Sequence, residues 1–165
     1  MNNALTLPLG LTLRLAEPDD GDFLYGLFCS ARPEFALLPL PKAQLEQLMR
    51  QQYEWQQKGY ASQYADVESW IIENPSGMVG KIMLHTSAGL LHIIDFIIAP
   101  DSRGLGIGSA ILEALKQYVA RNSGVLRLSV DRQNTHAKRL YLRQGFAVSQ
   151  VSDTHEQLSW SLTER

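Results

Sequence analysis

The sequence contains a single cysteine, Cys29, among its 165 residues, which excludes an internal disulfide and fits a reducing compartment such as the cytoplasm. We expect Cys29 to be a small buried residue rather than a catalytic nucleophile. The longest apolar runs are too short to cross a bilayer, and the first residues lack the basic and apolar segments of a signal peptide. We therefore expect no association with a membrane.

The sequence also has little net charge, because 15 basic residues nearly balance 17 acidic ones and leave a net charge of −2. Such a balance gives no reason to expect nucleic-acid binding. The four histidines, His85, His92, His136 and His155, form no metal-site pattern with the cysteine, so no metal is expected. A hydrophobic content of 45% is ordinary for a globular chain, and the length predicts one domain over residues 1–165.

Two common phosphate-binding patterns are missing from the most glycine-rich stretch, residues 100–108. A nucleotide P-loop requires Gly-Lys-Ser/Thr, and no such tripeptide follows here. The dinucleotide fingerprint requires Gly-x-Gly-x-x-Gly, whereas Gly104, Gly106 and Gly108 are each two residues apart. These two classes of nucleotide site are therefore excluded at this turn.

The segment around this turn nevertheless predicts a buried strand, a glycine-rich turn and a helix. Residues 90–99 are almost uniformly apolar, and residues 107–121 carry apolar side chains at helical spacing. Glycines allow a ligand to approach the backbone, and the positive end of the helix dipole lies at the same place. The turn is thus suited to a phosphate or pyrophosphate, although a tight connection without a ligand has the same pattern.

The turn reads Arg103-x-x-Gly106-x-Gly108, which resembles the acetyl-coenzyme A signature of the GNAT superfamily of N-acetyltransferases. The apolar strand that ends at Pro100 is similar to the fourth strand of that family. A second family landmark follows about thirty residues later, as Asn134-x-x-Ala137-x-x-x-Tyr141-x-x-x-Gly145-Phe146. Two motifs in this order and spacing are far more specific than either one alone.

The patterns and the resemblance together predict an α/β fold of the GNAT type. We expect a central mixed, mostly antiparallel sheet of six to seven strands with helices on both faces. The predicted strands cover residues 11–15, 67–73, 78–86, 90–99, 125–130, 146–151 and 158–162. The predicted helices cover residues 20–31, 42–58, 107–121 and 134–143. The strand, helix and strand between residues 90 and 130 form the parallel crossover.

Two segments of the first half are less regular. Three prolines prevent a continuous helix between Arg32 and Pro41, so the apolar residues there form either a packed connection or a wall of the acceptor pocket. Gly59 is expected to end the helix that begins at Lys42.

The resemblance implies that acetyl-coenzyme A is the cosubstrate. Its pyrophosphate would lie on the backbone of Arg103, Gly104, Leu105, Gly106, Ile107, Gly108 and Ser109. The pantetheine arm would contact the backbone of Ile97 and Ile98 and the side of the helix that carries Asn134, Ala137 and Tyr141. Asn134 has an alternative role as the cap of that helix.

Acetyl transfer from a thioester to an amine needs a base for the amine, donors for the oxyanion and a proton for the departing thiolate. Tyr141 matches the family's tyrosine near the sulfur, and an ordinary phenol can protonate a thiolate. Packing in the core is the alternative role of this ring.

The base has two candidates, His92 and Asp95, which are the ionisable residues of the apolar strand. His92 lies where many relatives carry a glutamate. Strict alternation places the two side chains on opposite faces of the sheet, and a β-bulge in this strand would change that. Asp95 has the alternative role of a buried carboxylate bonded to backbone.

We therefore interpret the sequence as an acetyltransferase that acts on a primary amine by direct attack, with a small-molecule amine as the acceptor. A protein N-terminus or lysine is the alternative acceptor. A non-catalytic acyl-coenzyme A-binding module and a plain structural domain are the alternatives outside this class. Many relatives in the family form dimers, so a homodimer is a possible assembly.

Overall fold

The structure, a computed structural model, describes residues 5–162, and residues 1–4 and 163–165 of the predicted domain lie outside this part. Its centre is a seven-stranded sheet in the order β1-β2-β3-β4-β5-β7-β6. The strands are β1 (Thr12–Leu15), β2 (Glu68–Asn74), β3 (Gly77–Ser87), β4 (Leu90–Ile98), β5 (Val125–Asp131), β6 (Ala147–Val151) and β7 (His155–Ser161). Within the described chain β4 and β5 are parallel, and the other neighbouring pairs are antiparallel.

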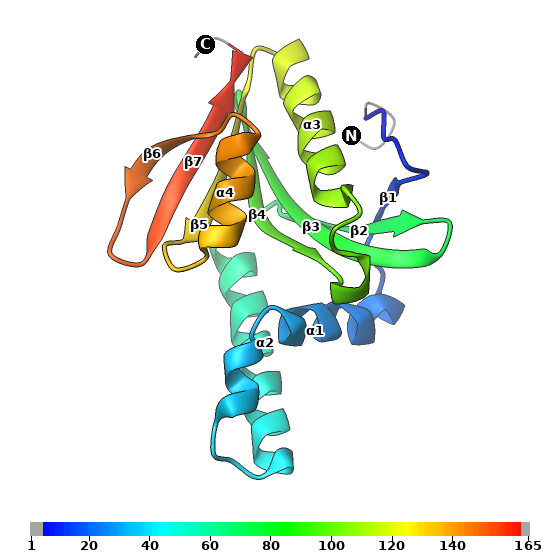
Figure 1. Cartoon of the computed structure of the whole chain (residues 1–165), viewed down its shortest axis with the longest axis vertical. Coiled ribbons are helices and arrows are strands. Elements are labelled where there is room, and N and C mark those ends of the chain that lie inside the picture. The colour runs from blue at the N-terminus through cyan, green and yellow to red at the C-terminus, as the bar shows by residue number, and fades with distance from the viewer. Residues whose placement is uncertain (1–4, 163–165) are drawn as a thin grey trace.

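In the described part of the chain, four α-helices cover the sheet: α1 (Gly21–Ser30), α2 (Lys42–Gln63), α3 (Ile107–Arg121) and α4 (Thr135–Arg143). Helices α3 and α4 lie on one face, while α1 and α2 lie toward the other face, where α2 extends away from the sheet (Figure 1). Apolar residues spaced three and four apart on α3 explain its packing, because Ile111, Leu112 and Leu115 are fully buried against the sheet. The predicted fold class is confirmed.

The boundaries of α2 correct one prediction. Gly59 does not end this helix, which continues to Gln63. The backbone of Gly59 has no positive φ, so the glycine takes an ordinary helical conformation. Tyr53, Tyr60 and Tyr64 are spaced seven and four residues apart and continue one face of the helix past Gly59. Their packing outweighs the cost of about 1 kcal/mol for a glycine inside a helix.

The segment before α2 forms a short 3₁₀ turn, Pro33–Leu37, and no continuous helix, which agrees with the prediction from its prolines. Of the two alternatives for its apolar residues, a packed connection is wrong for the leucines. Leu37 is 84% exposed, and Leu38 and Leu40 are also exposed. The turn lies beside α2 where that helix leaves the sheet, so little core is available for them.

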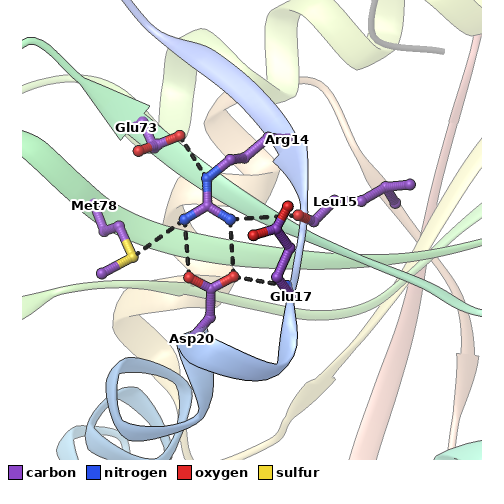
Figure 2. A network of polar contacts seen from close by, with 6 residues as sticks. All are labelled: Arg14, Leu15, Glu17, Asp20, Glu73 and Met78. Carbon is purple, nitrogen blue, oxygen red and sulfur yellow. Dashed lines mark hydrogen bonds and ion pairs between the residues drawn. The ribbon is translucent and has the colours of Figure 1, made fainter.

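A polar network fixes the start of the chain to the sheet (Figure 2). The Arg14 guanidinium donates to both carboxylate oxygens of Asp20 at 2.8 and 2.9 Å and to Glu73 Oε1 at 2.8 Å. Asp20 also accepts the Glu17 N–H at 2.7 Å. Because Arg14 lies on β1, Asp20 directly before α1 and Glu73 on β2, the network sets where α1 leaves the sheet.

Candidate functional site

The site begins where β4 and β5 separate. These strands pair in parallel only from Leu90 to Ile93 on β4 and from Val125 to Leu128 on β5. Beyond Ile93, β4 stays paired with β3 but not, within residues 5–162, with β5. Backbone groups on the β5 side of residues 94–98 are therefore available to an amide-containing ligand, and of these the Ile98 carbonyl already accepts one bond from Arg103.

A β-bulge lies at the same point of β4. Ile93 is opposite Leu84 and Asp95 is opposite Met83, so Ile94 is an extra residue in the ladder. The bulge reverses the alternation beyond it. Asp95 and His92 consequently share the face toward α2, where strict alternation would have separated them.

A cavity of about 410 Å³ occupies the gap between the two strands. Its wall combines side chains from the α3 and α4 face with side chains from the α1 and α2 face, so it connects the two faces of the sheet. The lining residues are Ala31, Arg32, Glu34, Ile93–Ile97, Leu128–Asp131, Asn134, Ala137, Tyr141 and His155. Of the residues proposed from sequence, this cavity brings together Asp95, Ile97, Asn134, Ala137 and Tyr141. His92 and Ile98 are outside its lining.

The glycine turn lies between the end of β4 and the start of α3 (Figure 1). Gly104 and Gly106 have φ values of +75° and +79°, a conformation that favours glycine. Arg103 Nε donates to the carbonyl of Ile98 at 3.1 Å and so ties the turn to the end of β4. The first backbone bond of α3 runs from Ala110 N to Gly106 O at 3.0 Å. The amides of residues 107–109 therefore precede the helix's own hydrogen bonds and can bind an anion.

Two further residues proposed for the turn, Leu105 and Gly108, leave space for a ligand. Leu105 is 61% exposed. A Cβ added at Gly108 would meet only Leu140 Cδ2, at the ordinary distance of 3.9 Å. Nothing in the protein itself requires a glycine at 108, so space for a ligand is the physical reason that fits it.

Helix α4 carries the second motif. Asn134 Oδ1 accepts the Ala137 N–H at 3.1 Å, so the capping role of Asn134 is realised. The Tyr141 ring packs against Phe146 with the ring centroids 5.9 Å apart. Burial, and in second place the negative charge of Asp95, raise the pKa of Tyr141 to about 12. The phenol therefore keeps its proton at neutral pH and is a hydrogen-bond donor at the cavity.

Asp95 has a partner that the sequence alone did not suggest. Lys81 Nζ on β3 lies 3.0 Å from Asp95 Oδ2, and the lysine side chain is only 2% exposed. The signal in the sequence was Lys81 itself, a charged residue in the middle of the predicted strand 78–86, which needs a partner if it is buried. The pairing depends on the bulge register, which could not be predicted from the strand pattern.

Three tyrosines of α2 and its end lie on the same side of the sheet as Asp95, outside the lining of the cavity. Burial, and after it the charge of Asp95, raise the pKa of Tyr60 to about 12, and burial likewise raises the pKa of Tyr53. Tyr64 lies over two histidines, with ring centroids 5.1 Å from His85 and 5.7 Å from His92. Their helical spacing was visible in the sequence, but the predicted end at Gly59 left Tyr60 outside the helix and separated Tyr64 from its last residue, Gln63.

His92 is half-buried on the face toward α2. Burial lowers its pKa, and the positive charges of Arg127 and His85 lower it further. The imidazole is therefore neutral near pH 7 and can accept a proton.

Within residues 5–162, no group of three or more His, Cys, Asp or Glu side chains is arranged to hold a metal ion. No helix in the same range is long and apolar enough to cross a membrane.

The family model of the acetyltransferase (GNAT) family matches residues 31–146, and the chain belongs to this family. The match confirms the predicted family. At the level of that family it also confirms an acyltransferase with acetyl-coenzyme A as cosubstrate.

Individual relatives agree with this assignment. An uncharacterized N-acetyltransferase of Methanocaldococcus jannaschii is 33% identical over 90 residues, which cover 53% of this chain and 57% of that protein. The match thus spans little more than half of that relative. The PaiA N-acetyltransferase of Thermoplasma acidophilum, solved with coenzyme A, has a TM-score of 0.68 at 18% identity and covers 92% of this chain and 98% of its own.

A spermidine N-acetyltransferase of Vibrio cholerae, solved with coenzyme A and spermine, has a TM-score of 0.63 at 18% identity. It covers 94% of this chain and 97% of its own. At these identities, the two solved structures establish that the fold is shared.

Proposed function

We propose that this protein transfers the acetyl group of acetyl-coenzyme A to a small-molecule primary amine by direct attack. The observation that carries the proposal is the cavity between β4 and β5, which connects the two faces of the sheet. Tyr141 lies at this cavity from the α4 side, and Asp95 lies at it from the α2 side. The thioester and the amine can therefore approach each other from opposite faces.

The cosubstrate would be held in two parts. Backbone amides of residues 103–109 would bind the pyrophosphate, where glycine conformations and the start of α3 provide an electropositive concavity. The unpaired β5 side of Ile97 and Ile98, together with the Asn134 and Ala137 side of α4, would hold the amide groups of the pantetheine arm. Since Asn134 Oδ1 already caps α4, its side-chain amide nitrogen is the group free to donate.

Proton transfer would involve one group on each side of the gap. Tyr141 donates its hydroxyl proton to the departing thiolate, which its raised pKa permits because the phenol is fully protonated before the reaction. His92 is neutral near pH 7 and accepts the amine proton, directly or through water. The carboxylate of Asp95 is paired with Lys81, which leaves it better suited to orient the acceptor ammonium than to remove its proton.

The name of one structural relative supports a small-molecule acceptor, since the spermidine N-acetyltransferase of Vibrio cholerae was solved with spermine bound. The presence of a single cysteine, Cys29, supports a cytoplasmic location. The homodimer stays a prediction, which the molecular mass from gel filtration would test.

The test is free-thiol release from acetyl-coenzyme A across a panel of primary amines, with a peptide N-terminus and a lysine peptide included. Turnover of small amines above the peptide background supports the proposal. Turnover confined to the peptides would instead support a protein acetyltransferase. Tight coenzyme A binding with no turnover of any acceptor would support a binding module.

A further inference from the structure

Three basic side chains form a row across the sheet face toward α2. His85 on β3 is opposite His92 on β4, and His92 is in register with Arg127 on β5. The neighbouring pair Leu91 and Leu126 is buried in the core on the other face, so the three basic residues share the face toward α2. The Tyr64 ring covers both histidines from the end of α2.

This row contains a buried donor without an acceptor. Arg127 Nε is buried and, among residues 5–162, has no hydrogen-bond partner and no ion pair. The next residue in register is Ser159 on β7, which carries no charge. Burial lowers the pKa of His92, and Arg127 and His85 lower it further, as expected where basic groups lie together without a carboxylate between them. A buried donor without an acceptor destabilises the fold, so an anion supplied by a ligand would stabilise this row.

The row lies next to the reaction cavity, just outside the residues that line it. Arg127 directly precedes Leu128 and Ser129, which both line the cavity. Ser129 and Arg127 are two residues apart on one strand face, or about 7 Å. On β4, His92 and Asp95 share this face because of the bulge. A molecule whose amine lies near Asp95 can therefore reach Arg127 with its other end.

We infer that the acceptor is an amino acid or a similar amine that also carries a carboxylate, and that Arg127 binds this carboxylate. The inference rests on the proposed acetyl transfer, because it assigns the acceptor of that reaction. A guanidinium binds a carboxylate through two parallel N–H···O bonds, which would satisfy the buried donor and fix the direction of the acceptor.

In the reaction, the amine nitrogen forms the new amide bond and the thioester C–S bond breaks. The amine proton goes to the base, and the thiolate receives a proton from Tyr141. The carboxylate is unchanged, so the product is an N-acetyl amino acid and free coenzyme A.

The test compares matched acceptors that differ only in the carboxylate: alanine against ethylamine, and lysine against 1,5-diaminopentane. Wild type should use each amino acid at least tenfold better in kcat/KM than its partner. Arg127→Gln should raise KM for the amino acids at least tenfold while leaving their kcat, and both constants for the partner amines, within about threefold. Arg127→Lys should restore part of the affinity. The control is Arg121→Gln at the exposed end of α3, where the side chain contacts only its own helix, and its kinetics should equal wild type.

A second measurement separates this inference from the acetyl-transfer proposal. Saturation-transfer NMR on the coenzyme A-bound protein detects amino-acid binding without turnover. Binding that is lost in Arg127→Gln supports the anion site even if no acceptor is turned over, in which case the acetyl-transfer proposal fails alone. A preference of wild type for the amines without a carboxylate would overturn the inference. So would equal losses for both members of a pair in Arg127→Gln, or the absence of amino-acid binding.

Discussion

Tyr141 has two possible roles, and a single oxygen atom distinguishes them. Its ring packs against Phe146, while its hydroxyl is available as a protonated donor at the cavity. Tyr141→Phe keeps the ring and removes the donor. If the hydroxyl protonates the thiolate, kcat should fall by about 10²–10⁴-fold, with the Kd of acetyl-coenzyme A within about twofold of wild type.

Two measurements accompany this substitution. A melting curve shows whether the ring still packs, because a purely structural tyrosine predicts a lower Tm and near-normal turnover of the folded fraction. A chemistry-limited kcat within twofold of wild type would rule out the proposed role of Tyr141.

His92 should determine the acid side of the pH–rate profile. A base must be deprotonated to act, and burial with two neighbouring cations holds the pKa of His92 below its ordinary value of 6.5. The rate should therefore rise with pH below pH 6.5 and be level above it. His92→Gln should lower kcat/KM at pH 7 by about 10²–10⁴-fold and abolish this limb.

The measurement is kcat/KM between pH 5 and 9 for wild type and His92→Gln. Asp95 is the competing base, and it is tested as Asp95→Asn with Lys81→Met, since Asp95→Asn alone would leave a buried lysine without its partner. An acid limb that persists in His92→Gln and disappears in the double variant would assign the base to Asp95.

At the scale of elements, the network between β1, β2 and the start of α1 should make the fold less stable at low pH. The hydrogen bonds from Arg14, and then that from the Glu17 N–H, lower the pKa of Asp20 from 3.8 to about 2. A carboxylate with a depressed pKa stabilises the fold above its unfolded pKa, and this stabilisation is lost as pH falls through the folded value. Asp20→Asn should therefore lower the Tm by a few degrees at pH 7, and the difference should shrink between pH 4 and pH 2.

Asp19→Asn is the matched control, because Asp19 is an exposed aspartate in the same turn and is not one of the residues of the network drawn in Figure 2. It should leave the Tm near that of wild type at every pH. A Tm difference for Asp20→Asn that stays constant from pH 7 to pH 2 would show that the carboxylate charge is not what stabilises this junction.

The features that could be predicted from the sequence are those that depend on residues close together in the chain. The glycines of the turn before α3 need only their own φ values, and Asn134 caps α4 through a bond three residues along the chain. What could not be predicted depends on strand register. The ion pair of Lys81 with Asp95, and the alignment of His92 with Arg127, require knowing which residue of β4 bulges and where β5 begins.

At the scale of the whole molecule, the sheet consists of two parts joined by a short seam. Strands β1 to β4 form one part and β5, β7 and β6 form the other, with four residue pairs between β4 and β5 connecting them. The strands diverge below this seam (Figure 1). A cosubstrate in the gap would bridge the two parts, so its binding should stabilise the fold and protect the edge of β4.

Hydrogen exchange can locate this bridge. Acetyl-coenzyme A at 100 times its Kd adds about 2.7 kcal/mol to stability, which corresponds to a rise in Tm of roughly 5–10 °C for a chain of this size. Amides of residues 94–98 and of the turn at 103–109 should exchange more slowly in the complex. The outer strand β6 is the internal control, because it lies at the far edge of the sheet and should exchange at an unchanged rate. Protection that appears equally on β6, or that is absent from 94–98 despite a raised Tm, would mean that the cosubstrate binds elsewhere than in the gap.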